Sequence, residues 1–538
     1  MNHVPVIEDT VSDLMAGNAM RYAEKGAFVF DDLEYSWKAA DEITDRIALQ
    51  LLEQGSVKGS HIGFWSLNTI ELVFYLIACM KIGAVTAVIN YSYRTYELEN
   101  TVRRADIQKL YIGENKKGSD YRSMAEKVRK VYPELLEIRD LHQDYRTVNE
   151  RYPLETRLSD HDVRLLREHK DGICSNDVLC ITFTSGTSAV PKAVMLTQKN
   201  VISDVKLFAE RMQAESHDVL LAPLPLFHSS GMSGMLLFAL CTGMKAIVLR
   251  MFKAEEVLRS IGHYHVTVMM AVPSMFELLT GNEHFAEYDT SSLRVAQTSG
   301  ASVEQKSFLA AVKKLKIKHL IMGYGQTECA PLITATLYED DLNKAVKTAG
   351  LPLPSVEVRI WNLEKDQSAA SGEKGEIQVR GPITMKGYYK AEEENQKKFT
   401  RDGWLRTADE GFLDGQGRLH FTARLSDMII RHGENISPVE IENVVRSGMK
   451  GIRAVKAVGV RKEIVEEEIA CLVQSDSGTV GPDEVRGCVR EMLASYKVPK
   501  YVFQIKEFPM TATGKIDLKK TKDMAEELVH AAEEKEKE

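Results

Sequence analysis

The sequence predicts an α/β protein with a large N-terminal domain of parallel sheets covered by helices, a small β-barrel-like subdomain and a small, mobile α+β C-terminal domain. From residue 177 to about 345, short apolar runs alternate with segments of helical periodicity, which is typical of parallel sheets covered by helices. Residues 346–422 change to short β-rich runs bounded by Gly and Asp turns. After residue 424, helical and strand-like segments alternate within a compact α+β unit.

The first part of the chain also alternates between the two periods. Helical periodicity covers residues 36–54 and 69–82, and each segment ends at a glycine, Gly55 and Gly83. Residues 61–65 and 85–90 are short apolar runs that predict buried strands. The charged segment 112–176 predicts helices and connecting loops. The apolar stretch 232–251 is interrupted by Lys245 and contains two glycines, which favours a core helix plus a strand over a membrane span.

The later elements follow the same rules. Strands are expected at 356–360, 375–379 and 417–421 in the β-rich subdomain. In the C-terminal part, helices are expected at 438–447 and 484–493, and strands at 455–460 and 468–473. The tail, 517–538, is dominated by Lys, Glu and Ala, which predicts a frayed, solvated helix.

Composition excludes several classes of protein. The 538 residues carry a net charge of −8, and no basic stripe with interleaved aromatic residues is present, which argues against a nucleic-acid partner. The seven cysteines are scattered and odd in number, as expected of reduced thiols in a cytoplasmic protein. The N-terminus has no apolar signal region, and no integral membrane segment is expected. A homodimer is left open.

The most informative segment is TFTSGTSAVPK, residues 182–192, which follows an apolar run at 177–181. Hydroxyl side chains, exposed backbone N–H groups and a lysine can together surround phosphate oxygens. The segment is not a Walker loop, because Pro191 precedes Lys192 and Ala193 follows it. It is a candidate polyphosphate loop, and the alternative is a Ser/Thr-rich surface turn.

A second segment, GYGQTE at 323–328, follows the apolar run 319–322. Its glycines allow the backbone to approach a ligand closely, and the face of Tyr324 can stack on a purine. The carboxylate of Glu328 can hold Mg²⁺ beside phosphate oxygens. The alternative is an ordinary strand-to-helix turn.

These segments and several others resemble, in the same order, the motifs of the adenylate-forming superfamily of acyl-CoA synthetases, peptide-synthetase adenylation domains and beetle luciferases. The phosphate segment resembles TSGTTGxPKG, and YGQTE matches YGxTE in full. The remaining matches are PLFH at 225–228, TSGAS at 298–302, DGWLRTAD at 402–409, GENISPVEIE at 433–442 and TGK at 513–515. The chain is most similar to fatty acyl-CoA synthetases.

The resemblance implies a role for each matched residue. The phosphate loop would comprise Thr184, Ser185, Gly186, Thr187, Ser188 and Lys192. Tyr324 and Gly325 would lie at the adenine, Thr327 at the α-phosphate and Glu328 at Mg²⁺, and Gly300, Ala301 and Ser302 would line the adenine and acyl pockets. Asp409 and Arg424 would hold the ribose, Gly433 would line the pantetheine tunnel, His228 would gate thiol access to the acyl pocket, and Lys515 would stabilise charge on the α-phosphate and carboxylate oxygens.

The chain departs from the family pattern at several small residues. Ser188, Ala189 and Ala193 replace Thr, Gly and Gly, and Ala408 and Ala423 also stand where glycine is usual. Alanine disfavours a positive φ by about 1 kcal/mol or more, so either these positions need no left-handed geometry or the loops differ. Ser426 occupies the hinge position, where Asp or Lys is usual, and Asp517 replaces a frequent basic residue.

The resemblance implies an ATP-dependent acyl-CoA ligase. A carboxylic acid would react with Mg·ATP to give acyl-AMP and pyrophosphate, and CoA would then accept the acyl group. Domains are expected at 1–424 and 428–538, with residues 346–424 as the β-rich subdomain and 425–427 as the hinge. The alternatives are an aryl-acid CoA ligase, a stand-alone enzyme that loads a carrier protein, a luciferase-like monooxygenase and a non-catalytic nucleotide-binding homologue.

Small or apolar residues are expected to line the acyl pocket, which favours a medium- to long-chain fatty acid. Peptide-synthetase domains that take α-amino acids usually have an Asp in the PLFH segment, and its absence argues against an amino-acid substrate. The expected lining residues are His228, Ser229, Gly231, Gly234, Met235, Ser299, Pro331 and Leu332.

Overall fold

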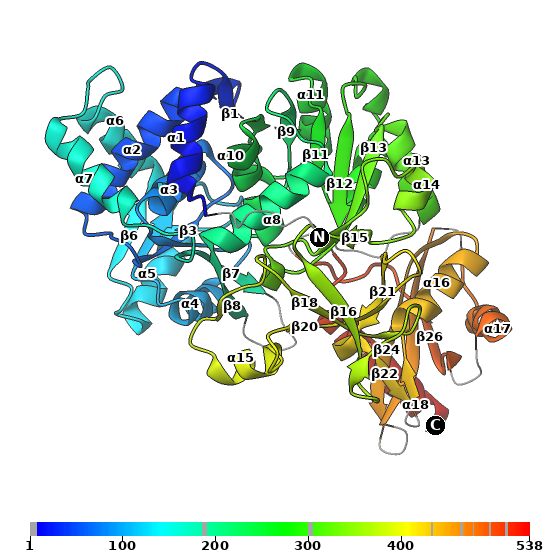
Figure 1. The fold of residues 1–538 in the computed structure, drawn as a ribbon. Coiled ribbons are helices and arrows are strands. Elements are labelled where there is room, and N and C mark those ends of the chain that lie inside the picture. The colour runs from blue at the N-terminus through cyan, green and yellow to red at the C-terminus, as the bar shows by residue number, and fades with distance from the viewer. Residues whose placement is uncertain are drawn as a thin grey trace. The chain divides into compact units, whose positions relative to one another are not determined.

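The computed structural model describes residues 8–184, 191–299, 305–431, 434–462, 466–476, 478–493, 497–511 and 515–537 (Figure 1). The chain divides into two compact units. The first comprises Met1–Gly300, Gln305–Val358 and Val379–Leu405, and the second comprises Ala301–Glu304, Arg359–Gln378 and Arg406–Glu538. Among the described residues, each helix is either too short or too polar to span a lipid bilayer.

The first unit contains a nine-stranded sheet in the order β15-β14-β13-β12-β11-β9-β10-β1-β2. Its middle strands, from β13 to β1, are mutually parallel, and antiparallel strands lie at both edges. The parallel strands are β1 (Gly26–Phe30), β9 (Val219–Leu221), β10 (Lys245–Ile247), β11 (Val268–Met270), β12 (Val295–Ser299) and β13 (His319–Tyr324). The edge strands are β2 (Leu33–Ser36), β14 (Thr334–Ala335) and β15 (Leu351–Pro352).

A seven-stranded sheet forms the other half of this unit, in the order β19-β8-β7-β4-β3-β5-β6. The strands from β7 to β6 are parallel, whereas β8 and β19 continue the sheet in antiparallel fashion. The strands are β3 (His61–Trp65), β4 (Val85–Val88), β5 (Lys109–Ile112), β6 (Glu137–Asp140), β7 (Val178–Thr184), β8 (Lys192–Thr197) and β19 (Gly387–Tyr388). Parallel sheets covered by helices were predicted, and both sheets confirm this.

Helix boundaries in this unit follow from local capping. Helix α2 (Trp37–Glu53) begins after Ser36, whose hydroxyl accepts from the backbone of Ala39, and α3 (Ile70–Lys81) begins after Thr69 in the same way. Gly55 and Gly83, which follow these helices, have φ of 75° and 73°. The predicted helices at 36–54 and 69–82 are therefore confirmed.

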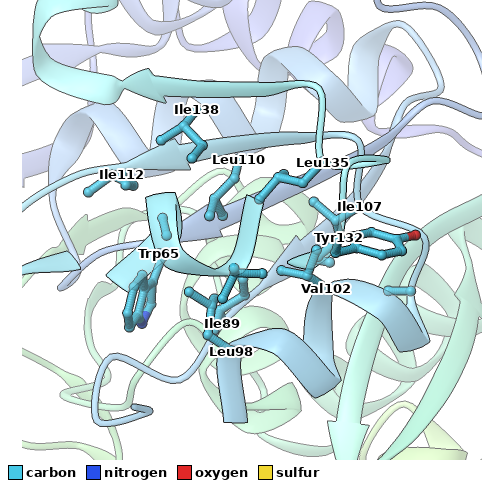
Figure 2. Close-up of a cluster of buried hydrophobic side chains, with 14 of the residues drawn as sticks. Trp65, Ile89, Leu98, Val102, Ile107, Leu110, Ile112, Tyr132, Leu135 and Ile138 are labelled. Atoms are coloured by element: carbon cyan, nitrogen blue, oxygen red, sulfur yellow. The ribbon is translucent and has the colours of Figure 1, made fainter. Parts of the chain in front are cut away.

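One face of the seven-stranded sheet packs on helices α4 (Thr95–Arg104) and α5 (Tyr121–Val131). Figure 2 shows the buried side chains between them, among which Leu98 and Val102 come from α4 and Leu110 from β5. Trp65 stacks on Tyr121 with ring centroids 3.9 Å apart. This apolar layer fixes β3, β4 and β7, and so fixes the strand that leads into the predicted phosphate loop.

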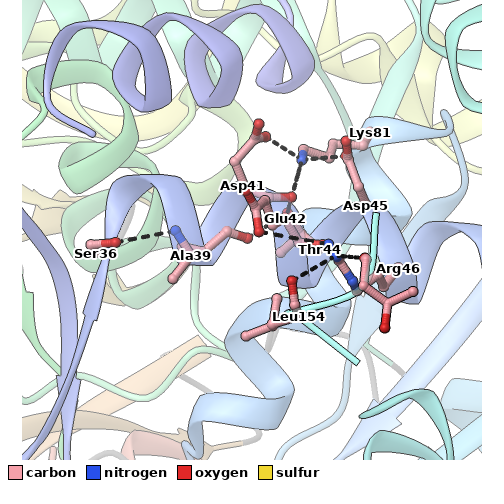
Figure 3. Close-up of polar contacts among 11 residues, drawn as sticks. Ser36, Ala39, Asp41, Glu42, Thr44, Asp45, Arg46, Lys81 and Leu154 are labelled. Carbon is pink, nitrogen blue, oxygen red and sulfur yellow. Dashed lines mark hydrogen bonds and ion pairs between the residues drawn. The ribbon is translucent and has the colours of Figure 1, made fainter. Parts of the chain in front are cut away.

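On the other side, α2 and α3 are joined by a buried ion-pair network (Figure 3). The Lys81 side chain is fully buried, and its Nζ lies 2.5 Å from Asp41 Oδ1 and 2.6 Å from Asp45 Oδ1. Burial lowers the pKa of Lys81, but Asp45 and Asp41 outweigh it and hold the net pKa above its ordinary value. Helix α6 (Leu141–Arg151) and α7 (Asp160–Asp171) also contact α2. We assign this network a structural role.

Several further helices complete the first unit. The predicted core helix plus strand at 232–251 is confirmed as a π-helical turn, η1 (Met232–Leu237), followed by α10 (Phe238–Thr242) and β10. The others are α1 (Val11–Arg21), α8 (Gln198–Arg211), α9 (Ser229–Gly231), α11 (Ala254–His263), α12 (Pro273–Thr280), α13 (Gln305–Lys314), α14 (Leu342–Ala345) and α15 (Glu392–Lys398).

The β-rich segment is an open five-stranded sheet and not the barrel-like subdomain that was predicted. Its order is β17-β16-β18-β20-β21, and in the described residues the two outermost strands, β17 and β21, do not pair with each other. Closure into a barrel would require these two strands to pair, so within the described residues the sheet is open. The strands are β16 (Glu357–Asn362), β17 (Gln367–Ser368), β18 (Gly375–Arg380), β20 (Leu405–Leu413) and β21 (Leu419–Arg424).

The C-terminal part of the second unit is a small α+β fold, as predicted. Strands β24 (Ile452–Lys462) and β25 (Glu466–Ser475) form a long antiparallel pair, which β22 (Ile429–Arg431), β23 (Glu434–Ile436) and β26 (Tyr501–Gln504) extend. Helices α16 (Pro438–Gly448) and α17 (Pro482–Met492) cover one apolar cluster.

The tail forms helix α18 (Leu518–Lys537), as predicted, but the prediction that this helix is solvated is wrong for one of its faces. Ala525 and Val529 are buried, and they pack with Leu472 of β25 in a second apolar cluster. Thr521 on the same face is also buried. These three positions recur at a spacing of four residues, so they form a narrow apolar face that the high charge content of the tail obscured.

Candidate active site

The predicted phosphate loop connects two antiparallel strands. Thr184 at the end of β7 pairs with Lys192 at the start of β8, so the loop leaves and re-enters the sheet at one point. This hairpin differs from the strand-to-helix connection of a Walker loop. Ala193 pairs with Phe183 within the ladder and is buried, so its replacement of glycine needs no left-handed geometry. Residues Ser185, Gly186, Thr187, Ser188 and Ala189 lie outside the described residues.

The second motif occupies the end of β13 and the 3-10 turn η3 (Thr327–Cys329). A Cβ on Gly325 would lie 1.9 Å from the backbone oxygen of Pro331, so only glycine fits there. Strand β8 also contacts η3. The structure therefore brings Lys192 and the turn that carries Thr327 and Glu328 into one neighbourhood, and Tyr324 lies largely buried one residue before Gly325.

Glu328 is a largely buried carboxylate held by two side chains that the sequence analysis did not select. Tyr388 Oη donates a hydrogen bond to Glu328 Oε1 over 2.7 Å, and Lys398 Nζ lies 3.7 Å from the same oxygen. Lys192 Nζ lies over the Tyr388 ring, 5.0 Å from its centroid. Burial first, and then the charge of Glu328, raise the pKa of Tyr388 far above its ordinary value, so its hydroxyl stays protonated and donates.

The surroundings of Glu328 fit a divalent cation that is also bound by phosphate. Among the described side chains, the contacts of this carboxylate fall on Oε1, which leaves Oε2 available as a ligand. The described residues contain no group of three or more His, Cys, Asp or Glu side chains that could hold a metal ion by themselves. Mg²⁺ commonly takes one or two carboxylates together with substrate phosphates and water, so one carboxylate suffices.

The PLFH segment lies directly against the second motif. Ser229 Oγ is 3.2 Å from Thr327 Oγ1, and Ser233 Oγ donates to the backbone oxygen of Ala330 over 3.3 Å. The chain between these contacts is α9 and the start of the π-helical turn η1, a geometry frequent at functional sites. Gly231 is required here, because a Cβ would lie 2.1 Å from the backbone oxygen of Pro225.

His228 is the N-cap of α9, and its ring is oriented by the next turn of chain. The backbone N–H of Ser230 donates to His228 Nδ1 over 3.2 Å, and the Ser230 hydroxyl lies 2.7 Å from the same nitrogen. Since Nδ1 is an acceptor, the neutral ring carries its proton on Nε2. The neutral histidine is therefore held in the tautomer that carries an N–H donor at Nε2.

Several buried polar atoms in the motifs have no hydrogen-bond partner within the described part of the chain. Among them are Oγ1 of Thr298, at the start of the TSGAS segment, and Nε2 of Gln326. Buried polar groups normally have partners, so unpaired ones in a motif are candidates for bonds to a bound ligand. The predicted residues Gly300, Ala301 and Ser302 lie outside the described residues.

In the second unit, the predicted ribose pair is formed by neighbouring strands. Asp409 of β20 pairs in register with Arg424 of β21, and Arg424 Nε lies 3.4 Å from Asp409 Oδ1. The Asp409 side chain is buried, whereas Arg424 is exposed. Ala408 has φ of 62°, so this position adopts the left-handed geometry for which glycine is favoured. Ala423 lies in the β21 ladder opposite Glu410 and needs none.

Lys515 belongs to the same unit and is positioned by a short turn. Its backbone N–H donates to Thr511 Oγ1 over 3.1 Å, and the Thr511 N–H donates to its backbone oxygen over 2.6 Å. Burial first, and then the positive charge of Arg424, lower the pKa of Lys515 below its ordinary value. The positive charges of Lys515 and Arg424 repel each other, and a bound anion would relieve this repulsion. The predicted Gly433 lies outside the described residues.

Tyr388 and Lys398 were missed because no local pattern marks them. They lie 60 and 70 residues after Glu328 in the sequence, in the segment GYYKAEEENQKKF. The only signal was the paired tyrosines after Gly387, which mark a strand as readily as a site.

Comparison with known proteins agrees with the motifs. The chain matches the AMP-binding enzyme family over residues 15–389 and the AMP-binding enzyme C-terminal domain over residues 440–515. YngI of Bacillus subtilis, a protein assigned as an acyl-CoA synthetase, is 32% identical over 97% of this chain and 98% of its own length. The human mitochondrial medium-chain acyl-CoA ligase ACSF2 is 27% identical over 96% of this chain and 88% of its own length.

Solved structures share the fold along nearly the whole chain. The anthranilate CoA ligase AuaEII, in complex with anthranoyl-AMP, has a TM-score of 0.84 at 20% identity and covers 98% of this chain and 99% of its own. The o-succinylbenzoate CoA synthetase MenE of Bacillus subtilis, in complex with its acyl-adenylate, has a TM-score of 0.79 at 25% identity and covers 95% of this chain and 97% of its own.

The chain belongs to the AMP-binding enzyme family. Its class is that of the AMP-forming acid–CoA ligases, the acyl-CoA synthetases. The predicted membership of the adenylate-forming superfamily and the predicted enzyme class are both confirmed.

Proposed function

We propose that this enzyme activates a medium- to long-chain fatty acid with Mg·ATP, releases pyrophosphate and transfers the acyl group from acyl-AMP to CoA. The observation that carries the aliphatic substrate is the contact between Ser229 and Thr327. It joins an uncharged segment, residues 224–237 apart from His228, to the turn of the phosphate-binding motif. An acid whose carboxylate lies at Thr327 would direct its tail along that segment.

The side chains in and beside this segment suit a hydrocarbon tail. Met232, Met235 and Leu332 are almost fully buried, and Met270 lies beside Gly234. Methionine adapts its shape to flexible apolar groups. The name of ACSF2, a medium-chain acyl-CoA ligase, agrees with this choice of substrate.

In the first half-reaction, a carboxylate oxygen attacks the α-phosphorus and pyrophosphate leaves. Both reactants are anionic, so catalysis depends on orientation and on neutralising charge. Lys192 and Lys515 would supply positive charge, Thr327 a hydroxyl donor, and Asp409 with Arg424 would hold the ribose. Magnesium bound at Glu328 would supply further charge neutralisation to the phosphates.

In the second half-reaction, the CoA sulfur attacks the acyl carbon and AMP leaves. The thiol must lose its proton, and His228 would stand at the thiol entrance. We place a hinge at residues 425–427, between an N-terminal domain at 1–424 and a lid at 428–538. Rotation there would exchange Lys515 for the segment around Gly433, which is a hinge motion of a common kind.

ATP–pyrophosphate exchange across a panel of carboxylic acids tests the proposal, followed by mass spectrometry of the product formed with CoA. Octanoate and longer fatty acids should support exchange and yield acyl-CoA. Faster exchange with benzoate or o-succinylbenzoate would instead support an aryl-acid ligase, to which the likeness to MenE gives some weight. Transfer to a phosphopantetheinyl protein but not to free CoA would identify a carrier-protein loading enzyme. If no acid of the panel supported exchange, the proposal would be overturned.

A further inference from the structure

Helix α15 carries one side chain that binds the backbone of Tyr388 and another that lies beside Glu328. Asn395 Oδ1 accepts from the backbone N–H of Tyr388 over 2.7 Å, and Asn395 Nδ2 donates to the Tyr388 backbone oxygen over 2.9 Å. Lys398 follows Asn395 by three residues, so both side chains lie on the same face of the helix. One face of α15 therefore holds the backbone of Tyr388 and places the Lys398 ammonium beside Glu328, which Tyr388 also contacts.

Tyr388 is held from a second side as well. Strand β19 pairs with β8, with Tyr388 opposite Val194, two residues after Lys192. Its hydroxyl donates to Glu328 Oε1, and its ring lies beneath Lys192 Nζ. The tyrosine side chain thus connects the lysine of the phosphate loop with the carboxylate expected to bind the cation.

Lys398 is almost as enclosed as its partner. The exposed fractions of the side chains are 12% for Lys398 and 10% for Glu328. Lys398 Nζ also donates to Gln326 Oε1 over 3.4 Å, within the same motif. A buried carboxylate is costly without a counter-charge, and the separation of 3.7 Å gives it one without a tight bond.

We propose that Tyr388, Asn395 and Lys398 are positioning residues for Glu328, and that Lys398 is a built-in counter-ion that a divalent cation displaces when the nucleotide binds. This inference rests on the proposed use of Mg·ATP. Before binding, Lys398 neutralises Glu328 and Tyr388 orients it through Oε1. When the cation arrives at Oε2, it takes over the role of counter-ion and Lys398 no longer neutralises Glu328.

The two contacts predict opposite effects on the preference for magnesium. Removal of the Lys398 charge removes a competitor for Glu328, so the preference for the magnesium-bound nucleotide should rise. Removal of the Tyr388 hydroxyl lets the carboxylate rotate, so the same preference should fall. If the two side chains only stabilised the fold, their removal would not shift the preference for the magnesium-bound nucleotide in opposite directions.

Calorimetric titration with α,β-methylene-ATP, once with MgCl₂ and once with EDTA, measures this preference. The measure is the dissociation constant in EDTA divided by the dissociation constant in MgCl₂. Lys398→Met should raise the ratio about tenfold, and Tyr388→Phe should lower it by a similar factor. Lys398→Arg keeps the charge and should stay near the wild type. Lys397→Met is the matched control, because Lys397 is exposed on the same helix.

A double-mutant cycle of Glu328→Gln and Lys398→Met, measured by denaturant unfolding without ligand, tests the pairing itself. Each single variant should be less stable than the wild type, and the double variant should recover part of the loss. Equal ratios in wild type and Lys398→Met, or additive losses in the cycle, would overturn the inference. If the wild type binds the nucleotide in neither buffer, the proposed function fails instead.

Discussion

The two units each contain a charged centre built from the predicted motifs, and the centres differ in how their charges are arranged. In the first unit, Glu328 has opposite charge beside it in Lys398 and a hydrogen-bond donor in Tyr388. In the second unit, Asp409 pairs with Arg424, and Arg424 in turn lowers the pKa of Lys515. The first arrangement suits a carboxylate that binds a cation, and the second has excess positive charge that suits the binding of an anion.

The two motifs also differ in how strictly the backbone requires glycine. Gly325 in the first is enforced by close approach, with 1.9 Å between a Cβ and the oxygen of Pro331. Ala408 in the second has φ of 62° and retains a side chain where glycine would be less strained. A close approach to backbone excludes every side chain, whereas a left-handed φ only costs about 1 kcal/mol for alanine. Residue 325 therefore tolerates no side chain, whereas residue 408 already has one.

Gly325→Ala should have the largest effect. The Cβ would force apart η3 and the chain at Pro331, so we expect a loss of activity of about a hundredfold or more and a destabilisation of about 2 kcal/mol. Pyrophosphate exchange and denaturant unfolding measure the two. Gly17→Ala is the control, because that helical glycine has no atom within 4 Å of its Cβ position. Full activity in Gly325→Ala would contradict the steric argument.

Asp409→Asn should have the next largest effect. It removes the charge that pairs with Arg424 and that we propose accepts hydrogen bonds from the ribose hydroxyls, so we expect the KM for ATP to rise about tenfold while the fold is retained. Asp414→Asn on the same hairpin removes an ion pair with His420 and should leave this KM unchanged. An unchanged KM for ATP in Asp409→Asn would show that Asp409 and Arg424 do not bind the ribose.

The pH dependence of adenylate formation tests the cationic character of the second centre. Since the pKa of Lys515 is lowered from 10.5, its ammonium deprotonates as pH rises through this lower value, and the rate should fall on the alkaline side. Lys515→Arg keeps the positive charge to higher pH and should shift this decline upward. The same alkaline limb in both enzymes would assign the titration to another group.

The smallest effect is expected at the alanines. Ala408→Gly relieves a left-handed alanine and should change stability by about 1 kcal/mol or less, in the stabilising direction. Ala423→Gly is chemically the same change in a buried, extended strand and should destabilise by about 1 kcal/mol. Chemical denaturation of the pair measures the difference. Equal shifts would mean that the φ of residue 408 carries no strain.

Much of the fold follows from local sequence. The helices at 37–53 and 70–81 and the strand at 61–65 were predicted to within a residue or two, because each has clear periodicity and a cap or a following glycine. The open sheet at 357–424 was not distinguished from a barrel, since closure depends on which edge strands meet. The buried face of α18 was missed because Ala525 and Val529 are sparse among many charges.

The site was predictable where a motif is contiguous, and not where it is assembled from distant segments. Lys192, Thr327, Glu328 and Asp409 lie in recognisable motifs, and the structure brings the first three into one neighbourhood. Tyr388 and Lys398 reach Glu328 only because β19 pairs with β8 and α15 follows it. Such a contact depends on strand pairing, which no local pattern specifies.

The central claim is that Lys515 serves only the first of two half-reactions. The most direct measurement compares wild type with Lys515→Ala in two assays, formation of acyl-AMP from octanoate and ATP, and formation of octanoyl-CoA from supplied octanoyl-AMP and CoA. We predict that Lys515→Ala abolishes adenylate formation and leaves thioester formation close to that of the wild type. Equal loss in both assays would contradict the account.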